Sequence, residues 1–88
     1  MFEIAFAEGW DIFYSKMDRS WQKKIWKKIE KLKEKISARH LKHGLPFFVV
    51  ESGQDRICFE ESEKKRIIMF AGNHKQYEQW YGKMSRKG

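Results

Sequence analysis

The chain has 88 residues, of which 41% are hydrophobic and 16% aromatic. This content supports one small domain over residues 1–88 and excludes a disordered chain. No apolar run approaches the roughly 20 residues of a membrane-spanning helix, and no basic segment followed by an apolar one marks a signal peptide. The one cysteine, Cys58, excludes an internal disulfide, and we expect it to be buried in the core. We therefore expect a cytoplasmic protein that uses no metal or other cofactor, because the ligand patterns of structural zinc are missing.

The formal net charge of +7 is concentrated in one segment. Residues 18–43 hold ten Lys and Arg residues against three acidic residues, whereas the remainder of the chain balances nine against nine. Two interpretations remain open: a solvated helix face, or a surface that attracts nucleic acid or an acidic partner.

The first half of the chain predicts a strand followed by two helices. Residues 2–6 alternate with period two, as in a strand, and Gly9 ends that pattern. Residues 10–17 form a short predicted helix. A second, longer helix can be capped by Asp18 or Ser20. Its apolar stripe, with lysines opposite, consists of Trp21, Ile25, Ile29, Leu32 and Ile36, widened by Trp26. The short connection between the two helices favours a helical hairpin.

The second half predicts three strands and a final helix. Residues 37–46 are expected to form a polar loop, because Gly44 and Pro46 stop the preceding helix. The predicted strands are 47–50, 56–60 and 67–71, joined by a turn at 52–55 and a charged loop at 61–65. A short helix is predicted over residues 75–84.

This order predicts an α+β fold. We expect a small, mostly antiparallel four-stranded sheet, with a two-helix hairpin packed on one face and a short C-terminal helix. The first strand is expected to lie beside the last.

Two motifs in this order carry a resemblance to a known family. The stretch Gln54–Phe59 reads Gln-Asp-Arg-Ile-Cys-Phe, and the stretch Gly72–Tyr77 reads Gly-Asn-His-Lys-Gln-Tyr. Together they resemble the RelE/ParE superfamily of toxins from type II toxin–antitoxin systems, and the resemblance covers nearly the whole chain. In that family one strand carries an Arg-Ile/Leu-x-aromatic motif, and the next ends in a loop with His or Arg before a Tyr.

The resemblance implies a ribosome-dependent endoribonuclease that inhibits translation. RelE-like members cut mRNA in the ribosomal A site without a metal: the 2′-hydroxyl attacks the neighbouring phosphate and displaces the 5′-oxygen. Its implied partners are a cognate antitoxin, the ribosome and mRNA, with no membrane involved.

The resemblance also suggests roles for particular residues. Arg56 would grip the phosphate, although it could instead pair with Glu60 or Glu51. His74 would transfer a proton, and Tyr77 would stack on a base or assist that transfer. The candidate RNA contacts are Lys75, Tyr81, Lys24, Lys28 and Lys31, where a core position remains the alternative for Tyr81.

One departure from the family pattern keeps other functions open. Many RelE-like nucleases carry lysines or a carboxylate on the strand before the arginine motif, but residues 47–50 are all apolar. Glu51, at the end of this strand, could act as the base; otherwise a major catalytic group of the family is missing. The alternatives are a ParE-like inhibitor of DNA gyrase and a nucleic-acid-binding member of the superfamily with weak catalysis or none.

Overall fold

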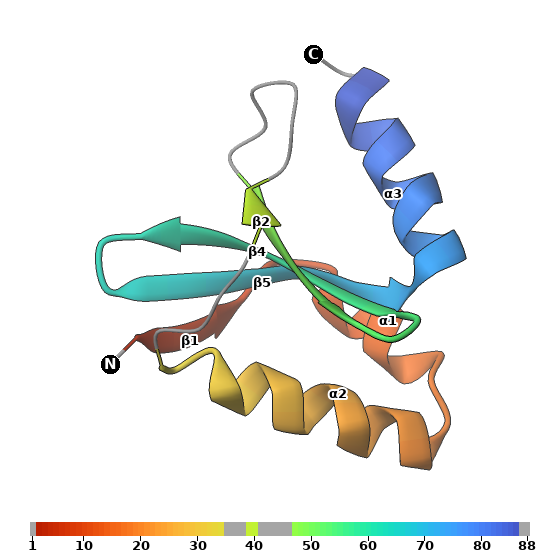
Figure 1. Cartoon of the computed structure of the whole chain (residues 1–88), viewed down its shortest axis with the longest axis horizontal. Helices are drawn as coiled ribbons and strands as arrows, with labels where there is room; N and C mark the ends of the chain where they lie inside the picture. The colour runs from red at the N-terminus through yellow and green to blue at the C-terminus, as the bar shows by residue number, and fades with distance from the viewer. Residues whose placement is uncertain (1, 35–38, 41–46, 87–88) are drawn as a thin grey trace.

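The computed structural model describes residues 2–34, 39–40 and 47–86, and Figure 1 shows α2 and α3 on opposite sides of one sheet. In chain order the elements are β1 (Glu3–Phe6), α1 (Trp10–Ser15), α2 (Arg19–Lys31), β2 (Arg39–His40), β3 (Phe47–Ser52), β4 (Asp55–Ser62), β5 (Lys65–Asn73) and α3 (His74–Arg86). No helix among the described residues is both long and apolar enough to cross a membrane.

The strand order of the sheet is β1-β5-β4-β3-β2. β1 runs parallel to β5, and the other neighbouring strands are antiparallel. The predicted α+β class and the position of the first strand beside the last are therefore confirmed. The two-residue strand β2 adds a fifth strand to the four predicted. It falls within the predicted loop 37–46, the rest of which lies outside the described residues.

The side of the sheet covered by α2 carries the larger core. Asp18 caps this helix, because its carboxylate accepts the backbone N–H of Trp21 at 2.8 Å. The predicted apolar stripe is buried at three positions, Ile25, Ile29 and Leu32, each at most 2% exposed. These side chains share a core with Ile57, Phe59 and Ile68 of the sheet. Ile36, the last predicted member of the stripe, lies outside the described residues.

A buried arginine closes the end of α2. Arg66 is 4% exposed, and its Nη1 donates to the carbonyl oxygens of Leu32 and Glu34, each at 3.0 Å. Its Nε donates to the Glu61 carboxylate at 3.0 Å, and its guanidinium lies 3.9 Å from the ring centre of Phe2. These contacts satisfy the carbonyl of Leu32, the residue that caps the C-terminus of α2, and that of Glu34 two residues further on.

The same arginine explains why the charged loop predicted at 61–65 is shorter. Glu61 pairs with Arg66 and Ser62 with Lys65 in the β4–β5 ladder, so only Glu63 and Lys64 connect the strands. The prediction placed this loop by its charge alone, whereas the ion pair between buried Arg66 and the more exposed Glu61 extends both strands.

A β-bulge in β5 rearranges the side of the sheet that faces α3. Cys58 pairs with Phe70 and Phe59 pairs with Ile68, so Met69 is an extra residue. The bulge turns Phe70 toward α3, where it shares a core with Cys58 rather than with Ile68. The ring of Trp80 from α3 stacks on Phe70, with 5.2 Å between the ring centres.

The short helix α1 contributes to both sides of the sheet. It begins after Gly9, whose φ of +88° favours glycine. Trp10 of this helix joins the core under α2, whereas Phe13 packs against the core under α3. The predicted hairpin therefore covers one face mainly through α2, and α1 borders both faces.

Candidate functional site

The junction between β5 and α3 is fixed by a reciprocal cap. The Asn73 side-chain oxygen accepts the backbone N–H of Gln76 at 2.8 Å, and the Asn73 backbone N–H donates to the Gln76 side chain at 3.0 Å. This is a capping box. It starts α3 at His74, one residue before the predicted start, and so sets His74 and Lys75 at the first two positions of the helix.

Gly72 allows the strand and the helix to meet closely. A Cβ at this position would lie 2.7 Å from the Gln76 Oε1 and 2.8 Å from the Phe70 ring. Both contacts are shorter than packed carbon atoms tolerate. Any larger residue would push apart the cap and the ring that hold α3 in place.

Three predicted site residues lie at this end of the sheet. In the ladders, Glu51 pairs with Arg56 and Arg56 pairs with Gly72, two residues before His74. Because side chains alternate along a strand and Cys58 faces α3, Arg56 also points to that side. We call Glu51, Arg56 and His74 the terminal row.

Arg56 closes the β3–β4 turn. Its Nη1 donates to the carbonyl oxygens of Gly53 and Asp55, both at 2.8 Å. Its Nε lies 3.3 Å from a Glu51 carboxylate oxygen, and its side chain is 12% exposed against 42% for Glu51. The pairing with Glu51, which the sequence left open as an alternative, is present in this structure. The guanidinium is thus held in a fixed orientation by the turn.

His74 remains accessible at the start of α3. Its side chain is 49% exposed, and its Nε2 contacts the carboxylate of Glu78 one helical turn further on. Lys75 is also exposed. The first turn of α3 contains no acidic residue, although negative charge is favoured at a helix N-terminus. His74 and Lys75 therefore stand at the positive end of the helix dipole, where anions bind in many proteins, and the Glu78 carboxylate offsets part of this charge at His74.

The two tyrosines of α3 are packed inward. Tyr77 is 8% exposed, with its ring centre 6.4 Å from Phe70 and 5.9 Å from Tyr81. Tyr81 is half-buried beside it. In this conformation the Tyr77 ring belongs to the core, so stacking on an RNA base would require α3 to shift.

The predicted lysines lie on a separate surface. Lys24, Lys28 and Lys31 line a hollow of about 580 Å³ together with Lys27 and the β3–β4 turn, Ser52–Asp55. We call these four lysines the lysine row. Trp21 anchors α2 to that turn, because its indole Nε1–H donates a hydrogen bond to the Asp55 carboxylate at 2.9 Å. The turn therefore borders both the lysine row and the Arg56 guanidinium.

The structure thus brings Glu51, Arg56 and His74 to one end of the sheet and keeps the lysine row apart from them. Among residues 2–34, 39–40 and 47–86, no three His, Cys, Asp or Glu side chains gather in a way that could hold a metal ion. The cap of α3 was missed from the sequence, although its Asn-x-x-Gln pattern at 73–76 is a recognisable signal.

The fold and the terminal row define a small α+β protein with a cationic helix start beside a mixed sheet. Searches by sequence find no matching family model and no similar curated protein. The fold, in contrast, is similar to that of a chain in the crystal structure of the RelB–RelE antitoxin–toxin complex from Methanococcus jannaschii. The TM-score is 0.66 at 13% sequence identity, over 88% of this chain and 98% of that chain. The RelE-like fold predicted from the sequence is confirmed at the level of the fold.

Proposed function

We propose that this chain is the toxin of a type II toxin–antitoxin pair and cleaves mRNA on the ribosome. The observation that carries the proposal is the terminal row, in which Glu51, Arg56 and His74 lie at one end of a RelE-like sheet. Phosphoryl transfer from RNA needs a base, a cationic phosphate contact and an acid. The terminal row offers one residue type suited to each task.

In the proposed reaction, the 2′-hydroxyl attacks the adjacent phosphorus as its proton passes to Glu51. The new bond joins the 2′-oxygen to phosphorus, and the bond from phosphorus to the 5′-oxygen breaks. Arg56 stabilises the charge on the phosphate oxygens through paired donors. His74 gives its proton to the leaving 5′-oxygen. The products are a 2′,3′-cyclic phosphate and a free 5′-hydroxyl.

The Arg56–Glu51 ion pair suggests how substrate binding starts the reaction. A phosphate that reaches the Arg56 guanidinium competes with Glu51 for its Nε, which lies 3.3 Å from the carboxylate. The displaced carboxylate then becomes available to the 2′-hydroxyl. Because the Gly53 and Asp55 carbonyls still hold the guanidinium, Arg56 keeps its orientation during this exchange.

In this proposal the lysine row binds the phosphates of structured ribosomal RNA. Its four ammonium groups lie on one hollow beside the β3–β4 turn, and lysines that contact phosphates raise affinity without reading sequence. The antitoxin would be a small acidic protein that covers the positive surfaces. The RelB–RelE complex is a precedent for such a pair in a chain of this fold.

A second candidate function is inhibition of DNA gyrase without RNA cleavage. It is favoured by β3, which carries no lysine, and by Glu51, which occupies the Arg56 guanidinium. A ParE-like inhibitor needs a binding surface but no catalytic groups.

The test uses ribosomes programmed with a defined mRNA, alongside a gyrase supercoiling assay. We expect the wild-type chain to cut the mRNA and leave supercoiling unchanged. His74→Gln and Arg56→Lys should each reduce the cleavage rate about 10²-fold or more, as expected for loss of a positioned acid or phosphate contact. Lys64→Gln is the matched control, because it removes one charge in the β4–β5 connection and should cut normally. Full-rate cleavage by both site variants would contradict the proposal, and inhibition of supercoiling without cleavage would favour the gyrase candidate.

A further inference from the structure

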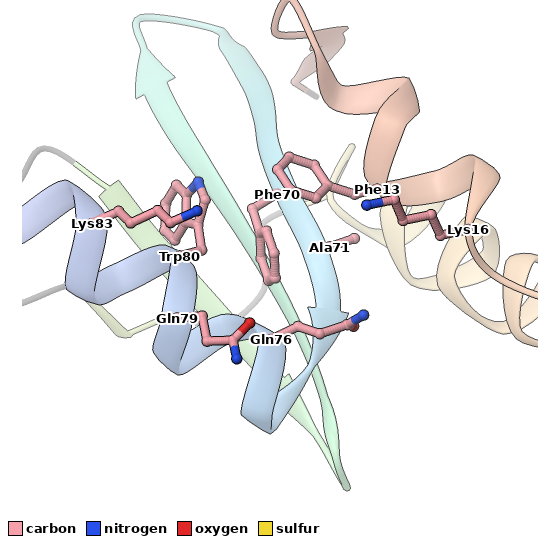
Figure 2. A pocket seen from close by; sticks show the side chains of 8 residues that line it. All are labelled: Phe13, Lys16, Phe70, Ala71, Gln76, Gln79, Trp80 and Lys83. Atoms are coloured by element: carbon pink, nitrogen blue, oxygen red, sulfur yellow. The ribbon is translucent and has the colours of Figure 1, made fainter.

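A hollow of about 330 Å³ lies between α1 and α3, beyond the terminal row. Figure 2 shows α1 side chains on one side of this α1–α3 hollow, α3 side chains on the other, and β5 between them. Its lining residues are Phe13, Lys16, Phe70, Ala71, Gln76, Gln79, Trp80 and Lys83. Neither Arg56 nor His74 is among them, so the hollow is separate from the proposed reaction centre.

The floor of the hollow is aromatic because of the bulge at Met69. Phe70 is turned to this side and is 1% exposed. Trp80 stacks on it with an angle of 20° between the rings, whereas Phe13 meets it edge-on at 68° and 4.9 Å. Phe13 and Trp80 are only half-buried, so their rings contribute an accessible apolar surface. Planar, apolar ligands suit such a surface.

The rim of the hollow is polar and cationic. Lys16 lies on the α1 side, and Lys83 lies on the α3 side (Figure 2). Gln76 and Gln79 add two amides, and that of Gln76 is fixed by its bond to the Asn73 backbone. Within the lining there is no acidic residue. The hollow thus combines an aromatic floor, two amides and two separated ammonium groups. This combination matches a ligand with a planar heterocycle and anionic groups on both sides of it.

The hollow is close enough to the terminal row for a single RNA strand to contact both places. His74 and Trp80 lie on the same helix, and their six-residue separation corresponds to about 9 Å along the axis. Gln76 connects the two places, since it caps α3 beside His74 and also lines the hollow. A volume near 330 Å³ is at the low end of the roughly 300–1,000 Å³ of ligand sites, which suits a single nucleotide.

We propose that the α1–α3 hollow binds one unstacked nucleotide of single-stranded RNA, next to the phosphate that the terminal row contacts. The base lies over Phe13 and Trp80, the two glutamines reach its edge, and Lys16 and Lys83 contact the flanking phosphates. Stacking on aromatic side chains is the usual way that proteins hold unpaired bases. This inference rests on the proposed function, because it names a place for a neighbouring nucleotide of the same RNA.

The test measures binding apart from cleavage. A five-nucleotide RNA with 2′-O-methyl groups cannot be cut, and a strand of equal charge with abasic positions separates stacking from electrostatics. We expect the base-bearing strand to bind at least about fivefold more tightly than the abasic strand, with amide NMR shifts at the lining residues. Lys16→Gln and Lys83→Gln are exposed changes that should preserve the fold, and each should weaken binding several-fold more than Lys64→Gln.

Three results would overturn this inference. One is equal affinity for the base-bearing and abasic strands, and another is unchanged binding by both rim variants. The third is a set of NMR shifts at the hollow with an acidic amphipathic peptide but not with RNA, which would make it a protein-docking site. Failure of the two proposals is distinguishable. A chain that binds the oligonucleotide in the hollow but leaves ribosomal mRNA intact disproves only the nuclease, whereas normal cleavage with no binding in the hollow disproves only the subsite.

Discussion

The two sides of the sheet differ in how completely they are filled. Under α2, the side chains of Ile25, Ile29 and Leu32 are at most 2% exposed, and a smaller hollow of about 220 Å³ lies between this helix and β1. Under α3, aromatic rings leave an open hollow, and the helix begins with exposed basic residues. The difference suggests that the buried face of α2 mainly supplies stability, while its exposed lysine row remains a binding surface. The α3 side gives up some stability to form the reactive surface and the α1–α3 hollow.

Truncation of one side chain that packs into the core on each side should give the largest difference. Ile29→Ala should lower the free energy of unfolding by roughly 2–5 kcal/mol, because it leaves a cavity in a closed core. Met69→Ala, at the half-buried bulge on the α3 side, should cost about half as much or less. Urea unfolding followed by tryptophan fluorescence measures both values. Equal losses would show that the two sides are packed alike.

Replacement of Arg66, at the end of α2, and of Arg56, on the α3 side, tests the same contrast between the two sides of the sheet. Arg66→Met should cost about 1–3 kcal/mol of stability, because it leaves the Leu32 and Glu34 carbonyls and the Glu61 carboxylate without their donor. Arg56→Met should cost less, since water can reach the turn carbonyls that it releases. Denaturant midpoints of the two variants provide the comparison. A larger loss for Arg56→Met would make that residue chiefly structural.

The cap of α3 should have a smaller and more local effect. Asn73→Ala removes the side chain that accepts the Gln76 N–H and should cost about 1 kcal/mol. Because the loss is confined to the start of α3, amide hydrogen exchange should accelerate there and stay unchanged in α2. The matched variant Asp18→Ala removes the α2 cap and should show the reverse pattern. Uniform acceleration in both helices would contradict this local account.

The Cys58 thiol of the folded protein should react least, with almost no alkylation by an added reagent. The thiol is fully buried and burial raises its pKa, as expected for the core position predicted from the sequence. At pH 8 the folded thiol therefore stays protonated and should resist iodoacetamide, whereas the urea-unfolded chain reacts at the rate of an ordinary cysteine. Above about pH 8.5, where an unfolded thiol ionises, the same shift favours unfolding. Rapid alkylation of the native chain would mean that the α3 side opens readily.

Much of this fold could be predicted from local patterns. The stripe of α2 and the alternation of Ile57, Cys58 and Phe59 identify buried faces because their periods are those of a helix and a strand. The position of β1 beside β5 was also predicted, although its parallel direction was not. The buried faces depend on sequence spacing, which is visible without coordinates, whereas the place of β1 was an expectation about strand order.

The features that were missed depend on pairing between distant segments. The bulge at Met69 arises from the register between β4 and β5, and the run Ile67–Ala71 is apolar throughout, so no break in alternation marks it. The donor to the Leu32 carbonyl at the C-terminal end of α2 comes from Arg66, 34 residues further along the chain. The residues of the terminal row were named as candidates from the sequence. The hydrogen bonds from Arg56 to the turn carbonyls were not predicted, because they depend on the geometry of the β3–β4 turn, which residue spacing does not reveal.

The most direct test of a division of labour between the terminal row and the lysine row is a single-turnover measurement on programmed ribosomes. It compares His74→Gln with a Lys24, Lys28 and Lys31→Gln triple variant over a range of ribosome concentrations. We predict that His74→Gln lowers the maximal cleavage rate and leaves the half-saturating concentration unchanged. The triple variant should raise that concentration and weaken its dependence on salt, with the maximal rate retained. The opposite assignment of the two effects, or no effect of either change, would contradict the account.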